Sequence, residues 1–207
     1  MKTADVIIVG SGAAGLFNAL FLPQDYKVIV ITKKTVEESD SFLAQGGISA
    51  LKNPEDYDSY FEDTMKAGHY ENDKGAVEKM IKESPQIIQD LKDFGVRFDL
   101  KDGEIEFTRE GGHSTFRILH HEDLTGKEIT SHLYEEAKKR DNITIMENCM
   151  MIDIIEKDGE CKGIVYKDQD GNFDTIEAPD TVLATGGLGG LFKHSTNFRH
   201  LTADSLA

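Results

Sequence analysis

A glycine-rich turn near the start of the chain carries the clearest chemical signal. It consists of Gly10, Ser11, Gly12, Ala13, Ala14 and Gly15. In this G-x-G-x-x-G pattern the glycines allow a tight turn, close approach of the backbone to a pyrophosphate, and close packing of a helix on a strand. The phosphates of such a ligand lie against unpaired amides at the positive end of the helix. These residue types at this spacing predict a dinucleotide site.

The elements predicted around this turn strengthen the prediction of a dinucleotide site. Val6 to Val9 is an apolar, β-branched run typical of a strand buried on both faces. Apolar residues at helical spacing follow the turn and stop at Pro23. A second apolar run, Lys27 to Ile31, predicts a parallel partner strand. It ends in Thr32-Lys33-Lys34, where such units commonly have an acidic residue that binds the ribose hydroxyls.

The order of the later elements favours FAD over NAD. Helices are predicted at 54–67, at 73–94 (bent or divided near Ser84-Pro85) and at 127–140, with a hairpin at 96–108 and strands at 143–146 and 181–187. Between the last two strands, three runs at 151–156, 161–166 and 173–178 predict an antiparallel meander. We therefore expect an α/β, Rossmann-like FAD-binding domain of the glutathione-reductase class spanning 1–207. It combines a parallel central sheet with a three-stranded β-meander and a helical insertion.

Composition excludes several classes of function. The net charge of −15 argues against a nucleic-acid partner, which requires clustered Lys and Arg. No apolar run approaches the roughly 20 residues of a membrane span, and no signal-peptide pattern precedes the first strand, so a cytoplasmic location is expected. Cys149 and Cys161 form no C-x-x-C pair, and the seven histidines have no zinc-like spacing. A metal site is not expected.

Three segments together resemble a known family. They are Gly10–Gly15, Ser41-Phe-Leu-Ala-Gln-Gly-Gly-Ile48, and Thr108-Arg-Glu-Gly-Gly-His-Ser-Thr-Phe-Arg-Ile-Leu-His120 with Asp123-Leu-Thr-Gly126 after it. The chain resembles the flavoprotein subunits of the succinate dehydrogenase and fumarate reductase superfamily and, within it, the aspartate oxidases. The resemblance covers essentially the whole chain. It implies the N-terminal FAD-binding part of a longer flavoenzyme, with capping and C-terminal helical domains outside these 207 residues.

The resemblance also implies which residues contact FAD. They are Ser11 to Ala14, Lys33, the segment Asp40, Ser41, Phe42, Leu43, Ala44, Gln45, Gly46 and Gly47, and finally Met151 and Asp204. Asp40 stands where succinate dehydrogenases attach FAD through a histidine, and a carboxylate cannot form that bond, so the FAD is expected to be non-covalent. Thr202-Ala203-Asp204 replaces the family's usual Thr-Gly-Asp.

For the substrate, the resemblance implies L-aspartate or a related dicarboxylate. Glu110 is expected to orient the ammonium group that distinguishes L-aspartate from succinate, although composition alone would make it a solvated loop residue. His113 and Arg117 either bind the dicarboxylate or brace the loop, and His120-His121 are expected to pack and cap. Oxygen or fumarate would accept the electrons, and quinolinate synthase would use the iminoaspartate product for NAD biosynthesis. The alternatives are a succinate dehydrogenase or fumarate reductase flavoprotein, and a non-catalytic FAD-binding module.

Overall fold

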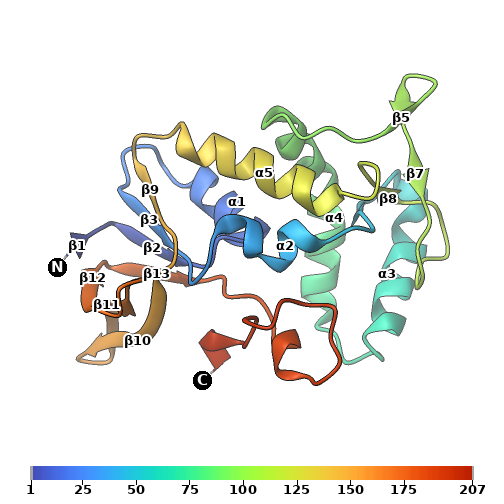
Figure 1. Cartoon of the computed structure of the whole chain (residues 1–207). Coiled ribbons are helices and arrows are strands. Elements are labelled where there is room, and N and C mark those ends of the chain that lie inside the picture. The colour runs from blue at the N-terminus through green and yellow to red at the C-terminus, as the bar shows by residue number, and fades with distance from the viewer. Residues whose placement is uncertain (1, 207) are drawn as a thin grey trace. The chain divides into compact units, whose positions relative to one another are not determined.

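The computed structural model describes residues 2–206, which form two compact units. The first unit joins the chain up to Leu43 to the chain from Ile129 onwards, and the second comprises Ala44–Glu128 (Figure 1). Among the described residues no helix has the length and apolar character needed to cross a membrane. Each unit is described in turn below.

The first unit is built on a four-stranded parallel sheet. In the order β13-β2-β3-β9, its strands are Asp180–Leu183, Val6–Val9, Val28–Ile31 and Ile143–Met146. All three neighbouring pairs are parallel. Every residue of β2 and β3 is buried, which explains why both strands consist of valine and isoleucine alone. The predicted central sheet is confirmed.

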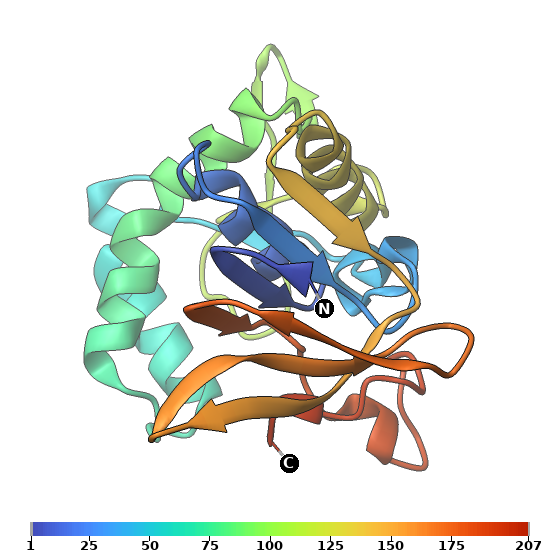
Figure 2. The same ribbon diagram turned by 90° about the vertical axis from the view of Figure 1, so that its left-hand side faces the viewer.

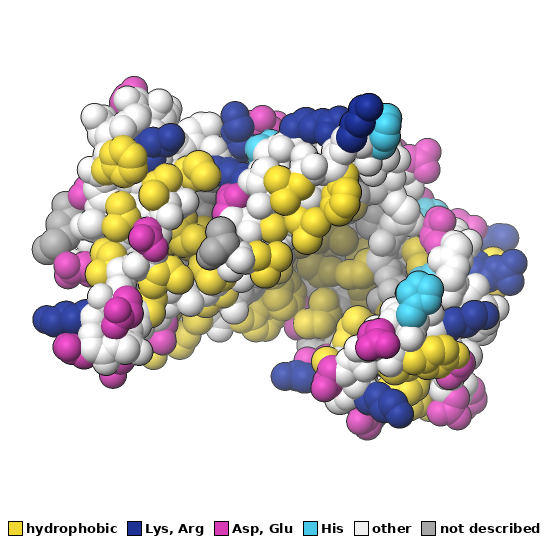
Figure 3. Space-filling view, turned by 90° about the horizontal axis from the view of Figure 1, so that it is seen from below, with side chains coloured by type: hydrophobic (Ala, Val, Ile, Leu, Met, Phe, Trp, Pro, Cys, Tyr) yellow, Lys and Arg dark blue, Asp and Glu magenta, His cyan; other side chains and the backbone are white. Residues whose placement is uncertain are grey.

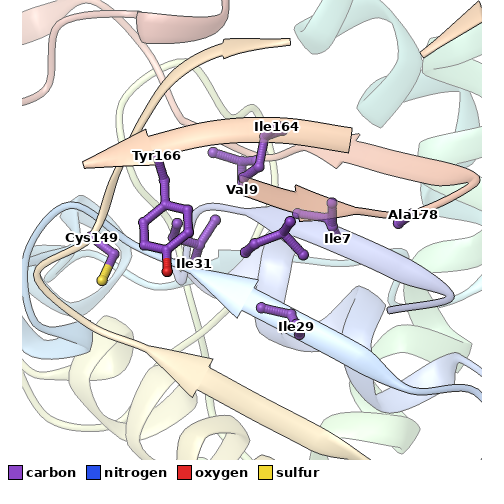
Figure 4. Close-up of a cluster of buried hydrophobic side chains, with 9 residues drawn as sticks. Ile7, Val9, Ile29, Ile31, Cys149, Ile164, Tyr166 and Ala178 are labelled. Carbon is purple, nitrogen blue, oxygen red and sulfur yellow. The ribbon is translucent and has the colours of Figure 1, made fainter. Parts of the chain in front are cut away.

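The two faces of this sheet are covered by different layers. Alternate side chains of β2 and β3 point to opposite faces, as in any strand. One set packs with Ala19 of helix α1 (Ala13–Phe21). The other set packs against the meander and comprises Ile7, Val9, Ile29 and Ile31, in contact with Ile164, Tyr166 and Ile176 (Figure 4). The core of the first unit therefore lies on both sides of the sheet that carries the glycine-rich turn.

The meander is formed by β10 (Met150–Lys157), β11 (Glu160–Lys167) and β12 (Phe173–Glu177). These three strands are antiparallel neighbours, as predicted (Figure 2). A two-residue strand, β1 (Lys2–Thr3), adds to β12 in parallel orientation. Sequence reasoning missed β1 because a strand this short carries no alternation of apolar and polar residues.

Two helices form the core of the second unit. A 3₁₀ turn at Pro54–Asp56 leads into α3 (Tyr57–Ala67), which packs on α4 (Lys74–Asp93). Of the two predictions for Ser84-Pro85, a bend or a division of the helix, the division is wrong, since α4 is continuous. Proline cannot donate to the carbonyl four residues earlier. That carbonyl, on Ile81, accepts a hydrogen bond of 2.7 Å from the Ser84 hydroxyl instead.

Short strands complete the second unit. The predicted hairpin is present but small, with β5 (Leu100–Lys101) paired to β6 (Glu104–Ile105). The strand that follows the hairpin, β7 (Phe107–Thr108), belongs to a separate three-stranded sheet of order β4-β8-β7. Its other strands are β4 (Ile48–Ser49) and β8 (Ile118–Leu119). Helix α5 (Thr125–Lys138) begins at the end of this unit and belongs from Ile129 onwards to the first unit. The β4-β8-β7 sheet was not predicted, because its two-residue strands show no periodicity.

Candidate functional site

A cavity of about 330 Å³ opens at the carboxyl ends of β2, β3 and β13. This is the edge of a parallel sheet at which α/β proteins bind ligands. Its lining includes most of the cofactor residues predicted for the first unit: Gly10, Ser11, Gly12, Ala14, Lys33, Asp40, Ser41, Met151 and Asp204. Segments far apart in sequence therefore meet at one site.

The glycine-rich turn needs its glycines for close packing. Gly10 has φ +114°, and a Cβ there would lie 2.1 Å from the Ala184 carbonyl oxygen of the neighbouring strand segment. A Cβ on Gly15 would lie 2.0 Å from the Gly10 carbonyl oxygen. Neither distance is compatible with a real side chain. The two glycines thus bring helix α1 onto β2 and fix the turn at the edge of the cavity.

The start of helix α1 offers polar groups to the cavity. Gly12 is the N-cap and has no side chain to satisfy the first amides of the helix, and the amide of Ala13 donates to Ser41 Oγ at 3.0 Å. Ser11 is 2% exposed, and its hydroxyl oxygen has no hydrogen-bond partner within residues 2–206. Burying a hydroxyl without a partner is unfavourable. An unpaired hydroxyl beside a helix N-terminus fits the pyrophosphate of a dinucleotide such as FAD.

An ion pair joins the end of β3 to the last described segment. The Lys33 ammonium lies 2.7 Å from Asp204 Oδ2 and donates to Thr202 Oγ1 at 3.0 Å, while Thr202 donates to Asp204 Oδ1 at 2.6 Å. Burial raises the pKa of Asp204, but the hydrogen bonds from Lys33 and Thr202 outweigh it and hold that pKa below its ordinary value. Ala203, between them, has φ +54°, a conformation that favours glycine.

The remaining predicted residues of the first unit lie outside the cavity lining. Ala13 and Gly15 support the turn through the contacts described above. Phe42 and Leu43 belong to the one-turn helix α2 (Asp40–Leu43) without lining the cavity. Residues 44–47 belong to the second unit.

In the second unit, Glu110 lies close to the predicted flavin-facing segment, the Ala44–Gly47 part of the stretch that the family resemblance places along the FAD. A Cβ placed on Gly46 would be 3.9 Å from the Glu110 carboxyl group, and Glu110 is exposed. The structure thus brings together the carboxylate proposed to orient the substrate and one glycine of the Ala44–Gly47 segment. This proximity was not deducible from spacing, because Gly46 and Glu110 are 64 positions apart in the sequence.

Arg117 braces the loop that contains Glu110 and His113. Its side chain is 0% exposed and makes a bidentate pair with Asp56, at 2.8 Å from Nε to Oδ2 and 2.8 Å from Nη2 to Oδ1. Nη1 lies 2.7 Å from Asp63 Oδ2 and 3.1 Å from His113 Nδ1, and Nη2 also donates to Ser59. The hydrogen bonds from Arg117 lower the pKa of Asp56 to about 2. Because its donors are already used, the structure favours the bracing role over dicarboxylate binding.

The adjacent histidines share one carboxylate. His120 Nδ1 and His121 Nδ1 lie 3.2 and 3.5 Å from the two oxygens of Asp99, and the His121 amide donates to Thr125 Oγ1 near the start of α5. The shared contact with Asp99 agrees with the packing predicted for the pair, and capping stays a prediction.

Sequence reasoning missed part of the lining of the cavity. The missed residues include Glu38, Ser39, Cys149, Ala184, Thr185, Gly186, Gly187, His200, Leu201 and Ser205. The segment after β13 could have been found, because a parallel strand that ends in glycines at this edge of the sheet is a ligand-site signal. His200 could not, because it lies in an irregular loop with no pattern around it.

Comparisons with known proteins identify the family to which this sequence is similar. The family described as FAD binding domain matches residues 5–207. The chain is 45% identical over 205 residues to an L-aspartate oxidase of Clostridium perfringens and 46% identical over 204 residues to one of Clostridium acetobutylicum. These matches cover 99% and 98% of this chain but 46% and 47% of the relatives, so the chain spans about half their length.

A solved structure supports the fold independently. The FrdA chain of a mutated E. coli quinol fumarate reductase superimposes with a TM-score of 0.93 and 28% identity, covering 99% of this chain and 36% of that one. The fold is thus an α/β FAD-binding fold with a parallel sheet, like that of fumarate reductase flavoproteins.

Proposed function

The chain belongs to the FAD binding domain family, and from this premise we propose that it supplies the FAD site of an L-aspartate oxidase. FAD would lie in the cavity at the carboxyl ends of β2, β3 and β13 without a covalent bond. The observation that carries the cofactor assignment is the buried, unpaired Ser11 hydroxyl at the start of α1, in a turn where Gly10 and Gly15 leave no space for a Cβ.

The residues of the first unit have distinct tasks toward the cofactor. The amides of the first turn of α1, apart from that of Ala13, which donates to Ser41, and the Ser11 hydroxyl would donate to the pyrophosphate. Lys33, at the end of β3, would face the adenosine half of the cofactor in place of the usual acidic residue. The β-meander packed behind the sheet supports assignment of this unit to the glutathione-reductase class.

The substrate proposal centres on Glu110 in the second unit. When bound, FAD would supply the redox chemistry, namely hydride acceptance from the substrate and electron transfer to oxygen or fumarate. Glu110 would bind the ammonium group of L-aspartate and orient the molecule. Its carboxyl group lies near Gly46 of the predicted flavin-facing segment, which supports this role. A substrate without the ammonium group gains nothing from this carboxylate.

A chimera tests the substrate proposal directly. In it, this chain replaces the matching part of the Clostridium perfringens relative. We expect the chimera to oxidise L-aspartate with oxygen or fumarate as acceptor. Because a charge-assisted hydrogen bond contributes about 1.5–3 kcal/mol, Glu110→Gln should raise the KM for L-aspartate roughly ten- to hundredfold and barely change succinate binding.

The matched control is Glu104→Gln, which changes an exposed carboxylate of the same unit and should leave both values unchanged. Equal effects of Glu110→Gln on L-aspartate and succinate would contradict the assigned role. Oxidation of succinate in preference to L-aspartate would favour the succinate dehydrogenase alternative. A hand-over of iminoaspartate to quinolinate synthase and a cytoplasmic location stay predictions.

A further inference from the structure

Asp40 contacts a loop that is distant in sequence and consists of residues 191–200. Its Oδ2 accepts a hydrogen bond from Asn197 Nδ2 at 2.7 Å, and its Oδ1 accepts one from the Phe198 backbone amide at 3.0 Å. All three residues belong to the first unit. Both carboxylate oxygens are therefore used to hold one short stretch of chain.

A second contact lies beside the first. His200 Nε2 is 2.8 Å from the carbonyl oxygen of Glu38, and its ring stacks on Phe198 at a centroid distance of 5.2 Å. The segment Glu38–Asp40 thus contacts the segment Asn197–His200 at two points. Glu38, Asp40, His200 and the following Leu201 all line the cofactor cavity.

Little apolar packing holds the rest of this loop. The side chains of Leu191 and Phe192 are 64% and 57% exposed. Figure 3 looks onto the side of the molecule that carries the loop, where apolar side chains lie exposed among charged ones. Arg199 donates to the carbonyls of Phe192 and Lys193, which closes the loop on itself without attaching it to the sheet. Hydrogen bonds to the 38–40 segment therefore fix its position, together with the contacts of Lys33 to Thr202 and Asp204 just after it.

We infer that Asp40 is a positioning residue for the cofactor cavity. By holding Asn197 and Phe198, it places His200 and Leu201 on the wall of the cavity before the cofactor arrives. A site whose wall is already ordered does not lose that freedom on binding, which increases affinity. This inference rests on the proposed FAD site, and it means that Asp40 affects FAD binding by holding the loop in place.

Two measurements on the purified chain test the inference. The first is the dissociation constant for FAD, followed by flavin fluorescence. Asp40→Ala should raise it roughly tenfold, because two hydrogen bonds to a charged group are lost. Asp40→Asn keeps an acceptor for the Phe198 amide and should raise it only about threefold. Asp25→Ala, which removes an exposed carboxylate from the same unit, is the matched control and should bind FAD like the wild type.

The second measurement does not depend on FAD. Trypsin cleaves after Lys193 and Arg199, both exposed and both in the loop. Without FAD, cleavage at these two sites should be roughly tenfold faster in Asp40→Ala than in the wild type or Asp25→Ala, because the opened loop is the substrate. Cleavage rates and FAD affinity within twofold of the wild type would overturn the inference. If the wild type binds no FAD but the cleavage rates differ as expected, the proposed cofactor site fails while the loop contact stands.

Discussion

The Arg117 cluster predicts how the stability of the second unit depends on pH. Asp56 is 9% exposed and pairs with Arg117, and its pKa is lowered from 3.8 to about 2. A carboxylate whose pKa is depressed by folding stabilises the folded state above its unfolded pKa, and this contribution is lost as the pH falls through the folded pKa. For Asp56 the window runs from about pH 4 down to about pH 2.

The magnitude follows from the size of the shift. At about 1.4 kcal/mol per pKa unit, lowering the pKa from 3.8 to about 2 corresponds to about 2 kcal/mol of folding stability at neutral pH. Asp56→Asn removes this charge and leaves Arg117, which is 0% exposed, with Asp63 as its remaining carboxylate. We therefore expect the variant to lose about 2 kcal/mol at neutral pH, and we expect the difference from the wild type to shrink as the pH approaches 2.

Urea unfolding at a series of pH values measures this difference. Asp58→Asn is the matched control, because Asp58 is an exposed carboxylate in the first turn of α3, two residues after Asp56, and its replacement should cost under about 0.5 kcal/mol. The reasoning is refuted if Asp56→Asn is as stable as Asp58→Asn at neutral pH. It is equally refuted if the loss in Asp56→Asn is the same at pH 3 as at pH 7.

Three further predictions concern the cofactor site. Ala203→Gly should raise the free energy of unfolding by about 0.5 kcal/mol. The strain of alanine at φ +54° in the folded state costs more than the extra conformational entropy that glycine gives to the unfolded chain. The control Ala178→Gly, at a position without a positive φ, should lower the free energy of unfolding instead. Gly15→Ala should weaken FAD binding at least about tenfold, since its Cβ would lie 2.0 Å from the Gly10 carbonyl, whereas Gly111→Ala, with open space around it, should bind normally in the same fluorescence titration. Acid precipitation of the FAD-loaded chain should leave all flavin in the supernatant, and flavin in the pellet would show that Asp40 has not prevented covalent attachment.

The elements that carry strong patterns were predictable from the sequence. Val6–Val9 and Val28–Ile31 are uninterrupted β-branched runs, and such runs are typical of strands buried on both faces. The glycine-rich turn between β2 and α1 then fixed where the cavity lies. Helix α4 shows the limit of such reasoning, because Pro85 is a helix breaker by type but is tolerated where Ser84 supplies the missing donor.

The parts that depend on distant contacts were not predictable. Nothing near Asp40 in the sequence indicates that its carboxylate holds Asn197 and Phe198. In the same way, Arg117 could equally have been a ligand for a carboxylate until its pairing with Asp56 was seen. Each of these residues owes its role to a partner more than 60 residues away in the chain.

Titration of the purified chain with FAD tests the central claim most directly. The account predicts saturable binding of one FAD per chain, followed by flavin fluorescence, with loss of affinity in Gly15→Ala and unchanged affinity in Gly111→Ala. Absence of saturable binding, or equal binding by the wild type and Gly15→Ala, would contradict the assignment of the cavity at the carboxyl ends of β2, β3 and β13 as the FAD site.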